Sequence, residues 1–385
     1  MPALTGVRFF AVFHIFLFHM FAWYWAPKPD ELKNMLIGLA DAPLTLVKFA
    51  SNGWMSTSFF FLLSGFILAY LYWDEDGRLA MPRQRFWAMR AARIYPVHLL
   101  VIAIIIAVRT PLHLEDGLSI GTLVSSGIAT AALLQAWVPS WVPVWSWPTW
   151  TLSVLVFLYL TMPWLMRALS QLSRRQMIAA LIAMPFISSI PTAAYAIWLN
   201  TSGAETTQNL DILIANNPVF WIPYFATGML MTRVFAINRF QPARQTPSWF
   251  SWGDAAVIAI LAVALTQFID QPWKFFIRQG LLMPFFIVIV LDLARGRGLL
   301  SKVFSLPGTG FLGETGFSIF IWQSFVVLIM YFTILTMPDI GPYQHWIAIG
   351  SVLLLSIAST YLLEKPMARW IRRRFIDAKT PEAST

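Results

Sequence analysis

The chain has 385 residues, of which 58% are hydrophobic and 16% aromatic, while only 12% are charged. Soluble domains are ~45–50% apolar and ~25% charged, so a soluble fold of this composition would lack the polar surface to cover itself. The apolar composition also excludes disordered and collagen-like chains, and the lack of cysteine excludes disulfide scaffolds and thiolate chemistry. We therefore predict an all-α polytopic membrane protein.

The apolar segments predict about ten transmembrane helices. In chain order they cover roughly 7–26, 54–73, 94–108, 150–168, 176–198, 218–237, 253–270, 277–294, 312–336 and 346–363. An eleventh stretch, 121–138, is richer in Ser, Thr and Gly and less apolar. We predict a single transmembrane domain over residues 1–368, followed by a basic cytoplasmic tail at 369–385.

The distribution of charge predicts the topology. The net charge of +9 does not require a nucleic-acid partner, because the side on which Lys and Arg lie matters more than their sum. Ten crossings from a cytoplasmic N-terminus place most basic residues inside and leave few, such as Lys274 and Arg278, outside. A crossing by 121–138 would move several arginine clusters to the far side. We therefore expect both termini in the cytoplasm, and a re-entrant or interfacial segment at 121–138.

The first span contains costly polar residues at Arg8, His14 and His19. Arg8 and His19 are 11 residues apart, which is about three helical turns, so they share one face and are separated by ~16 Å along the axis. This spacing places His19 near mid-membrane when Arg8 lies at the cytoplasmic entrance, while His14 lies on another face. The alternative is that Arg8 is only a topological anchor and His19 a hydrogen-bonded interior residue.

The first cytoplasmic loop carries a second basic cluster, formed by Arg83, Arg85, Arg90 and Arg93. A spacing of three puts Arg90 and Arg93 on one helical face, where two guanidinium groups suit a phosphate or pyrophosphate. The alternative is a role in topology and in binding lipid head groups.

The longest predicted loop, 109–149, is extracytoplasmic and ends in a cluster of tryptophans: Trp137, Trp141, Trp145, Trp147 and Trp150. Such residues form aromatic belts at the membrane interface. Their clustering also fits a surface on which sugar rings stack, because the CH groups of a pyranose pack on indole faces.

These features together resemble the acyltransferase-3 family, membrane enzymes that O-acylate cell-surface glycans and related acceptors. The segment from Leu4 to Arg8, followed by His19, resembles the family's opening Arg-x10-His signature. The other similar motifs follow in order: Ser58-Phe-Phe-Phe-Leu-Leu-Ser64-Gly65-Phe66, Phe86-x3-Arg90-x2-Arg93-Ile94-x-Pro96, Trp150-Thr-Leu-Ser-Val154, Pro223-Tyr-Phe225-x2-Gly228, Leu312-Gly-Glu314-x2-Phe317-Ser318-x-Phe320 and Leu363-Glu364-Lys-Pro366. The resemblance therefore covers nearly the whole chain.

The resemblance implies transfer of an acyl group, usually acetyl, from cytoplasmic acyl-CoA (acetyl-CoA) to a glycan or lipid-linked saccharide outside a bacterial inner membrane, without a metal. It implies that Arg8, Arg90 and Arg93 bind the CoA phosphates. We assign His19 as general base, because a sugar hydroxyl needs one and neutral imidazole, with an unperturbed pKa of ~6.5, accepts a proton. A covalent acetyl-imidazole is an alternative. We expect the acceptor to bind Trp145, Trp147, Trp150, Ser153 and Gln323. Besides donor and acceptor, we expect the protein to contact membrane lipids.

Two departures from the family pattern bear on activity. Leu155 stands where the family usually has Glu, and Gln323 where a His is common. Gln323 can still form hydrogen bonds, whereas Leu155 cannot accept a proton or orient an imidazole. The predicted spans place Leu155 on the acceptor side, so we expect reduced activity. The competing hypotheses are a non-enzymatic transporter or flippase, and an impaired family member that only binds substrate.

Overall fold

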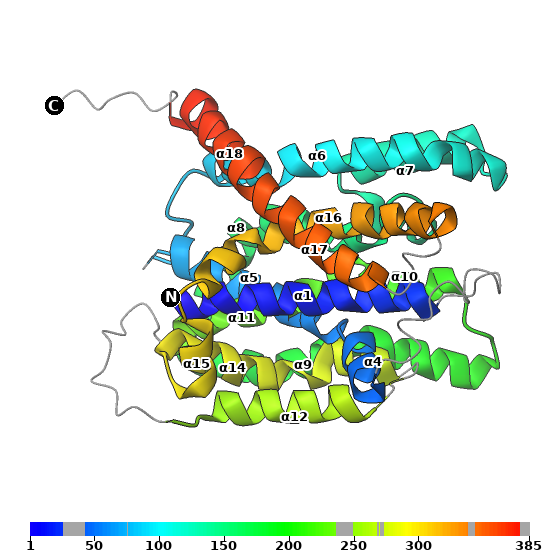
Figure 1. The fold of residues 1–385 in the computed structure, drawn as a ribbon. Helices are drawn as coiled ribbons and strands as arrows, with labels where there is room; N and C mark the ends of the chain where they lie inside the picture. The colour runs from blue at the N-terminus through cyan, green and yellow to red at the C-terminus, as the bar shows by residue number, and fades with distance from the viewer. Residues whose placement is uncertain are drawn as a thin grey trace.

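The computed structural model describes residues 1–25, 43–74, 76–235, 249–267, 269, 273–337 and 343–377. Within this part of the chain the fold is a bundle of helices, and the one β-contact is an isolated bridge between Trp73 and Leu79. The predicted all-α class is confirmed (Figure 1).

Seven helices of the described residues are long and apolar enough to cross a membrane. They are α1 (Pro2–Trp25), α5 (Met55–Tyr72), α6 (Arg83–Glu115), α8 (Trp150–Ser170), α9 (Arg174–Ser202), α16 (Thr309–Thr336) and α17 (Gln344–Ser359), which continues through a π-helix at Thr360–Glu364 into α18 (Lys365–Ile371). An eighth candidate is a broken helix, in which 273–281 meets α14 (Met283–Arg295) at a bend of 40°.

The remaining two predicted spans form shorter helices. The segment 218–237 becomes α11 (Ile222–Val234), preceded by one 3-10 turn, and 253–270 becomes α12 (Trp252–Thr266). The structure therefore gives seven or eight spans by length and composition, where ten were predicted. The weak segment 121–138 contains the 12-residue helix α7 (Ile120–Ala131), about 18 Å long, and a 3-10 turn at Gln135–Trp137.

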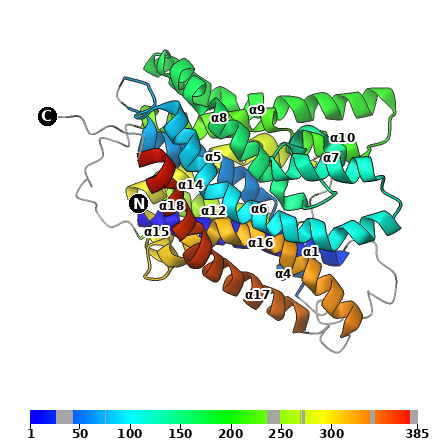
Figure 2. The ribbon, with the colours of Figure 1, turned by 90° about the horizontal axis from the view of Figure 1, so that it is seen from above.

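The two ends of the bundle are distinct in Figures 1 and 2. The start of α1, the short helix α15 (Gly298–Phe304) and the end of α18 lie together at one end. The short helices α4 (Leu44–Ser51) and α10 (Gln208–Asn216) lie toward the other end. Arg8 is thus near the end that carries the start of α1, and His19 lies about three turns farther along the same helix.

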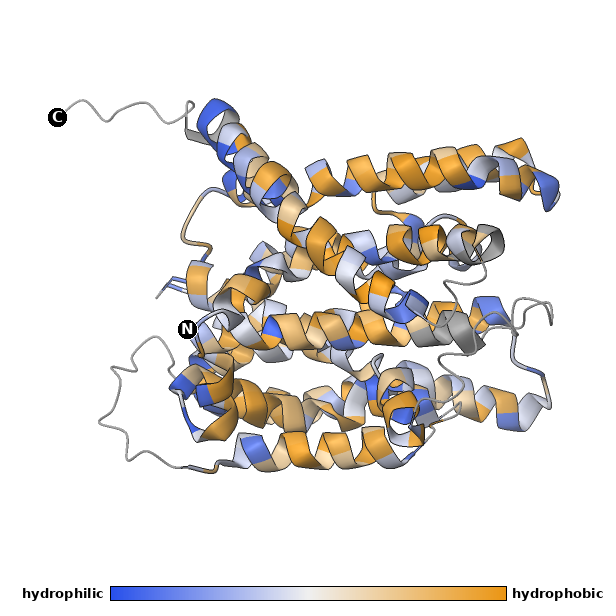
Figure 3. Cartoon of the chain, viewed as in Figure 1, coloured by the Kyte–Doolittle hydropathy of each residue, from blue (hydrophilic) through white to orange (hydrophobic). Residues whose placement is uncertain are grey.

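In Figure 3 the helices are coloured as hydrophobic along most of their length, including those on the outside of the bundle. The core contains fully buried Phe16, Phe61 and Trp221. On the outer surface, Phe186 is 73% exposed and Leu354 71% exposed. Helices that are apolar on all sides belong in lipid rather than in water, in agreement with an integral membrane protein.

Glycines of the sequence motifs lie where helices touch backbone to backbone. A Cβ atom on Gly65 of α5 would collide with the carbonyl of Phe225 in α11, and one on Gly228 of α11 would collide with the carbonyl of Leu62. Small residues allow such close crossings between membrane helices. These contacts fix α5 and α11 as one rigid pair beside the cavities described below.

Candidate active site

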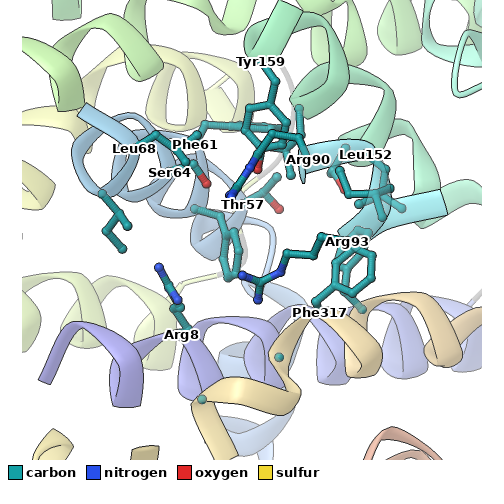
Figure 4. Close-up of a pocket in the computed structure, with 18 of the residues that line it drawn as sticks. Arg8, Thr57, Phe61, Ser64, Leu68, Arg90, Arg93, Leu152, Tyr159 and Phe317 are labelled. Carbon is teal, nitrogen blue, oxygen red and sulfur yellow. The ribbon is translucent and has the colours of Figure 1, made fainter. Parts of the chain in front are cut away.

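The structure brings the three predicted arginines together. Arg8 of α1 and Arg90 and Arg93 of α6 line one cavity of about 310 Å³, which we call the arginine pocket (Figure 4). Its other walls come from α5, α8 and α16. No Asp or Glu lines it among the described residues, so the pocket presents positive charge to an anion. Guanidinium groups are suited to phosphate in this setting.

Contacts hold two of these arginines in place. The Nη2 atom of Arg90 donates a hydrogen bond to the Tyr72 hydroxyl (3.0 Å), and the guanidinium stands over the rings of Tyr72 and Phe86 at 5.4 and 5.8 Å. The Nε atom of Arg93 lies 3.6 Å from Oε1 of Glu364. Since these partners fix the side chains, less freedom is lost when an anion binds.

The partner of Arg93 belongs to a small polar network that the sequence analysis did not identify. Ser318 of α16 donates to Oε2 of Glu364 (3.1 Å), and Thr360 donates to the Ser318 hydroxyl (2.9 Å). Glu364 and Thr360 lie in the π-helix that follows α17, a helix type often found at functional sites. Both Ser318 and Glu364 lay in family-like motifs, and a glutamate inside a span needs a partner, so the signal was present in the sequence.

His19 lies at the junction of two further cavities. The first, of about 220 Å³, contains His19, Trp150 and Arg278, and we call it the Arg278 cavity. The second, of about 820 Å³, contains His19, Trp145 and Gln323, and we call it the Trp145 cavity.

The Arg278 cavity adjoins the arginine pocket, because Ile15, Thr57 and Thr151 line both. We call these three residues the neck. The three cavities therefore follow one another along α1, from Arg8 through the neck to His19.

The two histidines of α1 have different environments. Nε2 of His14 donates to the carbonyl of Phe49 (2.8 Å), and Nδ1 accepts from the Ser56 hydroxyl (2.9 Å), so both ring nitrogens are used. The ring of His19 contacts Phe18 at 5.2 Å between centroids, and no hydrogen bond joins it to another described residue. Both ring nitrogens of His14 are thus used in packing α1, whereas those of His19 form no hydrogen bond with a described residue.

Four of the five predicted acceptor-binding residues line the cavities around His19. Trp145 is buried, and its indole N–H donates to the Ser126 hydroxyl (2.9 Å). Trp147 is 38% exposed and lines both cavities, while Trp150 lines the Arg278 cavity. Gln323 donates through Nε2 to the carbonyl of Phe320 (2.8 Å), and its buried Oε1 has no partner among the described residues. That oxygen is free to accept from a hydroxyl group.

Ser153 lies elsewhere. It is buried to 1% exposure and lines none of the three cavities, and its hydroxyl has no hydrogen-bond partner among the described residues. The structure therefore does not bring Ser153 to the cavities that contain His19.

Leu155 also lies elsewhere than expected. Thr151, Leu155 and Tyr159 follow at intervals of four on α8 and all line the arginine pocket. Leu155 lines neither cavity that contains His19. In this structure Leu155 therefore lies beside the arginines rather than beside His19.

Arg278, counted in the sequence only as a charge outside the membrane, is a residue of the site. It lies in a π-helix, Ile277–Leu281, between α13 (Trp273–Phe276) and α14, and is 7% exposed. Its guanidinium stands over both Trp150 and Trp221, at 4.9 and 5.0 Å from their ring centroids, which are 5.8 Å apart. Lys274 lines the same cavity. An arginine at the edge of an apolar run was the available signal.

No metal site is formed by the described residues, since they contain no group of three or more His, Cys, Asp or Glu placed to hold an ion.

The comparison with known proteins decides the family. The family model described as an acyltransferase domain, acyltransferase-3, matches residues 1–365. This chain belongs to the acyltransferase-3 family. It is therefore an O-acyltransferase of the membrane, and the resemblance seen in the motifs is confirmed.

Three other proteins are similar to this chain in sequence. Acyltransferase MdmB of Streptomyces mycarofaciens is 26% identical over all of this chain and 96% of its own length. Exopolysaccharide production protein ExoZ of Rhizobium meliloti is 25% identical over 83% of this chain and 90% of its own length. Peptidoglycan O-acetyltransferase OatA of Listeria monocytogenes is 21% identical over 90% of this chain, which corresponds to 55% of that protein. No solved structure matches the chain.

Proposed function

We propose that this acyltransferase moves an acetyl group from acyl-CoA in the cytoplasm to a hydroxyl of a glycan or lipid-linked saccharide on the other side of a bacterial inner membrane. The observation that carries the proposal is the position of His19. It lines the Arg278 cavity, which adjoins the arginine pocket, and also the larger Trp145 cavity.

The arginine pocket is the donor end of this arrangement. Arg8, Arg90 and Arg93 would bind the phosphates of CoA, which are anionic and suited to guanidinium forks. The pantetheine arm would pass the neck and bring the thioester beside His19. The start of α1 and the end of α18 lie at this end of the bundle, so we propose that both termini and the basic tail 369–385 are cytoplasmic. In this topology α11 and α12 also cross, which gives ten passes.

The Trp145 cavity is the acceptor end. Its volume of about 820 Å³ accommodates a sugar, Trp145 and Trp147 offer indole surface, and Gln323 offers an acceptor oxygen. A hydroxyl that enters this cavity can meet His19, which takes the proton as the oxygen attacks the thioester carbon. The names of ExoZ and OatA, which refer to an exopolysaccharide and to peptidoglycan, support a glycan acceptor.

The proposal is tested with the full chain in proteoliposomes. Radiolabelled acetyl-CoA is supplied on the face that carries Arg93, and an oligosaccharide probe on the opposite face. The proposal is supported if label appears in the oligosaccharide. In the control, acetyl-CoA is supplied only on the face that carries the oligosaccharide, and the label should then be lost. The proposal would be contradicted if the wild-type chain transferred no label to the oligosaccharide in intact vesicles.

A further inference from the structure

The Arg278 cavity contains a buried cation that forms no ion pair with a described residue. The one described carboxylate of this cavity, Asp211, accepts a hydrogen bond from the Tyr195 hydroxyl (2.8 Å). Arg278 is 7% exposed, its Nε is fully buried, and it makes neither an ion pair nor a side-chain hydrogen bond with any described residue. A guanidinium buried at membrane depth is costly unless an anion compensates it. Arg278 lines a cavity, so the compensating anion can be supplied by what binds there.

The protein holds this guanidinium in a fixed position. The Ser58 and Tyr224 hydroxyls both donate to the backbone carbonyl of Arg278, at 2.7 and 2.9 Å, which secures the π-helix at this residue. Trp150 and Trp221 hold the side chain through their ring faces, at 4.9 and 5.0 Å. Contacts with ring faces do not use the N–H groups at the edge of the guanidinium, which stay free for an oxygen atom.

The position of the cavity identifies the part of the substrate that meets Arg278. On the proposed function, the donor passes from the arginine pocket through the neck and enters the Arg278 cavity first. This cavity is about 220 Å³, against about 820 Å³ for the Trp145 cavity on the other side of His19. The small cavity suits the acyl thioester and the large one the sugar.

We propose that Arg278 is a catalytic residue that binds the oxyanion formed during acyl transfer. As the acceptor oxygen bonds to the thioester carbon, His19 takes the hydroxyl proton and the carbonyl π pair moves onto the carbonyl oxygen. Arg278 stabilises the negative charge there. When the carbonyl re-forms, the carbon–sulfur bond breaks and the CoA thiolate takes the proton from His19. A fixed donor aimed at developing charge in a dry site is an effective form of catalysis.

The inference rests on the proposed function, and its test separates the two. Full-length protein in proteoliposomes is given labelled acetyl-CoA and three acceptors: water, the neutral p-nitrophenyl β-glucoside and the anionic p-nitrophenyl β-glucuronide. We expect Arg278→Gln to lower kcat by roughly 10²–10³-fold for all three, because the oxyanion forms with any acceptor. The KM for acetyl-CoA should stay within about threefold, since the CoA phosphates bind elsewhere.

Two further variants make the result specific. Arg278→Lys keeps the charge without the planar fork and should lose less activity than Arg278→Gln. Arg233→Gln is the matched control, because Arg233 also stands over an indole, that of Trp73 at 4.6 Å, but lines none of the three cavities. Retained CoA binding shows that a variant is folded. If Arg278→Gln does not bind CoA, the kcat of Arg278→Lys is compared with that of the wild type instead.

Each contrary outcome has a distinct meaning. A loss confined to the glucuronide and expressed in its KM would assign Arg278 to an anionic acceptor, and unchanged kcat would leave it a structural role. Either result overturns the oxyanion assignment. If the wild-type chain acylates none of the acceptors, the proposed function itself fails. If the wild-type chain is active and Arg278→Gln equals it, only this inference fails.

Discussion

Arg93 and Glu364 join helix α6 to the C-terminal helices through an ion pair, with Nε and Oε1 3.6 Å apart. Glu364 is almost fully buried, while 46% of the Arg93 side chain is exposed. The pair thus places one carboxylate behind the arginine pocket and leaves the open side of Arg93 to a ligand.

Glu364→Gln should therefore destabilise the free protein, because Arg93 loses its counter-charge. The cost is on the order of 1–2 kcal/mol, since water still screens the half-exposed Arg93. CoA brings its own anions and should raise the melting temperature of the variant more than that of the wild type. Thermal unfolding with and without CoA measures both effects. Ser318→Ala, which leaves both charges in place, should behave more like the wild type, and equal CoA shifts in Glu364→Gln and wild type would refute the coupling.

His19→Ala should lower kcat for acyl transfer by at least about 10²-fold, because the general base is removed. His14→Ala is the matched control on the same helix. The ring nitrogens of His14 already form hydrogen bonds with Phe49 and Ser56, so His14→Ala should mainly lower the thermal stability and change kcat little. Single-turnover assays on both variants test the assignment, and an active His19→Ala protein would remove His19 from the role.

Leu155→Glu places a carboxylate among Arg8, Arg90 and Arg93. The new charge should pair with these arginines and compete with CoA phosphates, so we expect CoA binding to weaken by roughly 3–10-fold. The acceptor KM should not change, because Leu155 does not line the Trp145 cavity. Calorimetric titration with CoA measures the effect, and Leu155→Gln controls for side-chain size. Faster transfer with unaltered CoA affinity would instead support a catalytic part for an acid at this position.

Gly228→Ala should destabilise the bundle by roughly 1–3 kcal/mol, because its methyl group would overlap the carbonyl of Leu62. Gly350 of α17 has no neighbour that a Cβ would meet, so Gly350→Ala is a control substitution in another membrane helix. Unfolding in detergent compares the two variants. Similar stability of both would show that α5 and α11 can separate without cost.

Helical periodicity made part of the site predictable from the sequence. Arg8 and His19 fall on one face of α1 whatever surrounds that helix, and Arg90 and Arg93 share a face of α6 for the same reason. The face that a helix turns to its neighbours depends on packing, so the sequence did not indicate which cavity Ser153 and Leu155 would line. The position of Arg278 depends on a π-helix, a distortion that the apolar pattern of the sequence does not reveal.

The number of spans was harder to predict for a related reason. Hydropathy identifies an apolar segment but not where its helix ends. The segments 218–237 and 253–270 are apolar along most of their length, yet α11 and α12 end after 13 and 15 residues. The broken helix at 273–295 illustrates the same point, because a bend of 40° leaves hydropathy unchanged.

The neck formed by Ile15, Thr57 and Thr151 has a consequence for the membrane itself. On the proposed function the donor and acceptor lie on opposite sides of the membrane, so the enzyme needs a passage through the bilayer, and an open passage would let ions leak. Here one isoleucine and two threonines, contributed by α1, α5 and α8, bound the passage where the two cavities adjoin. A thin thioester arm can fill such a constriction while the bulky charged nucleotide stays behind. The donor would then act as the plug that preserves the permeability barrier, and the cell would need no separate exporter for the acyl group.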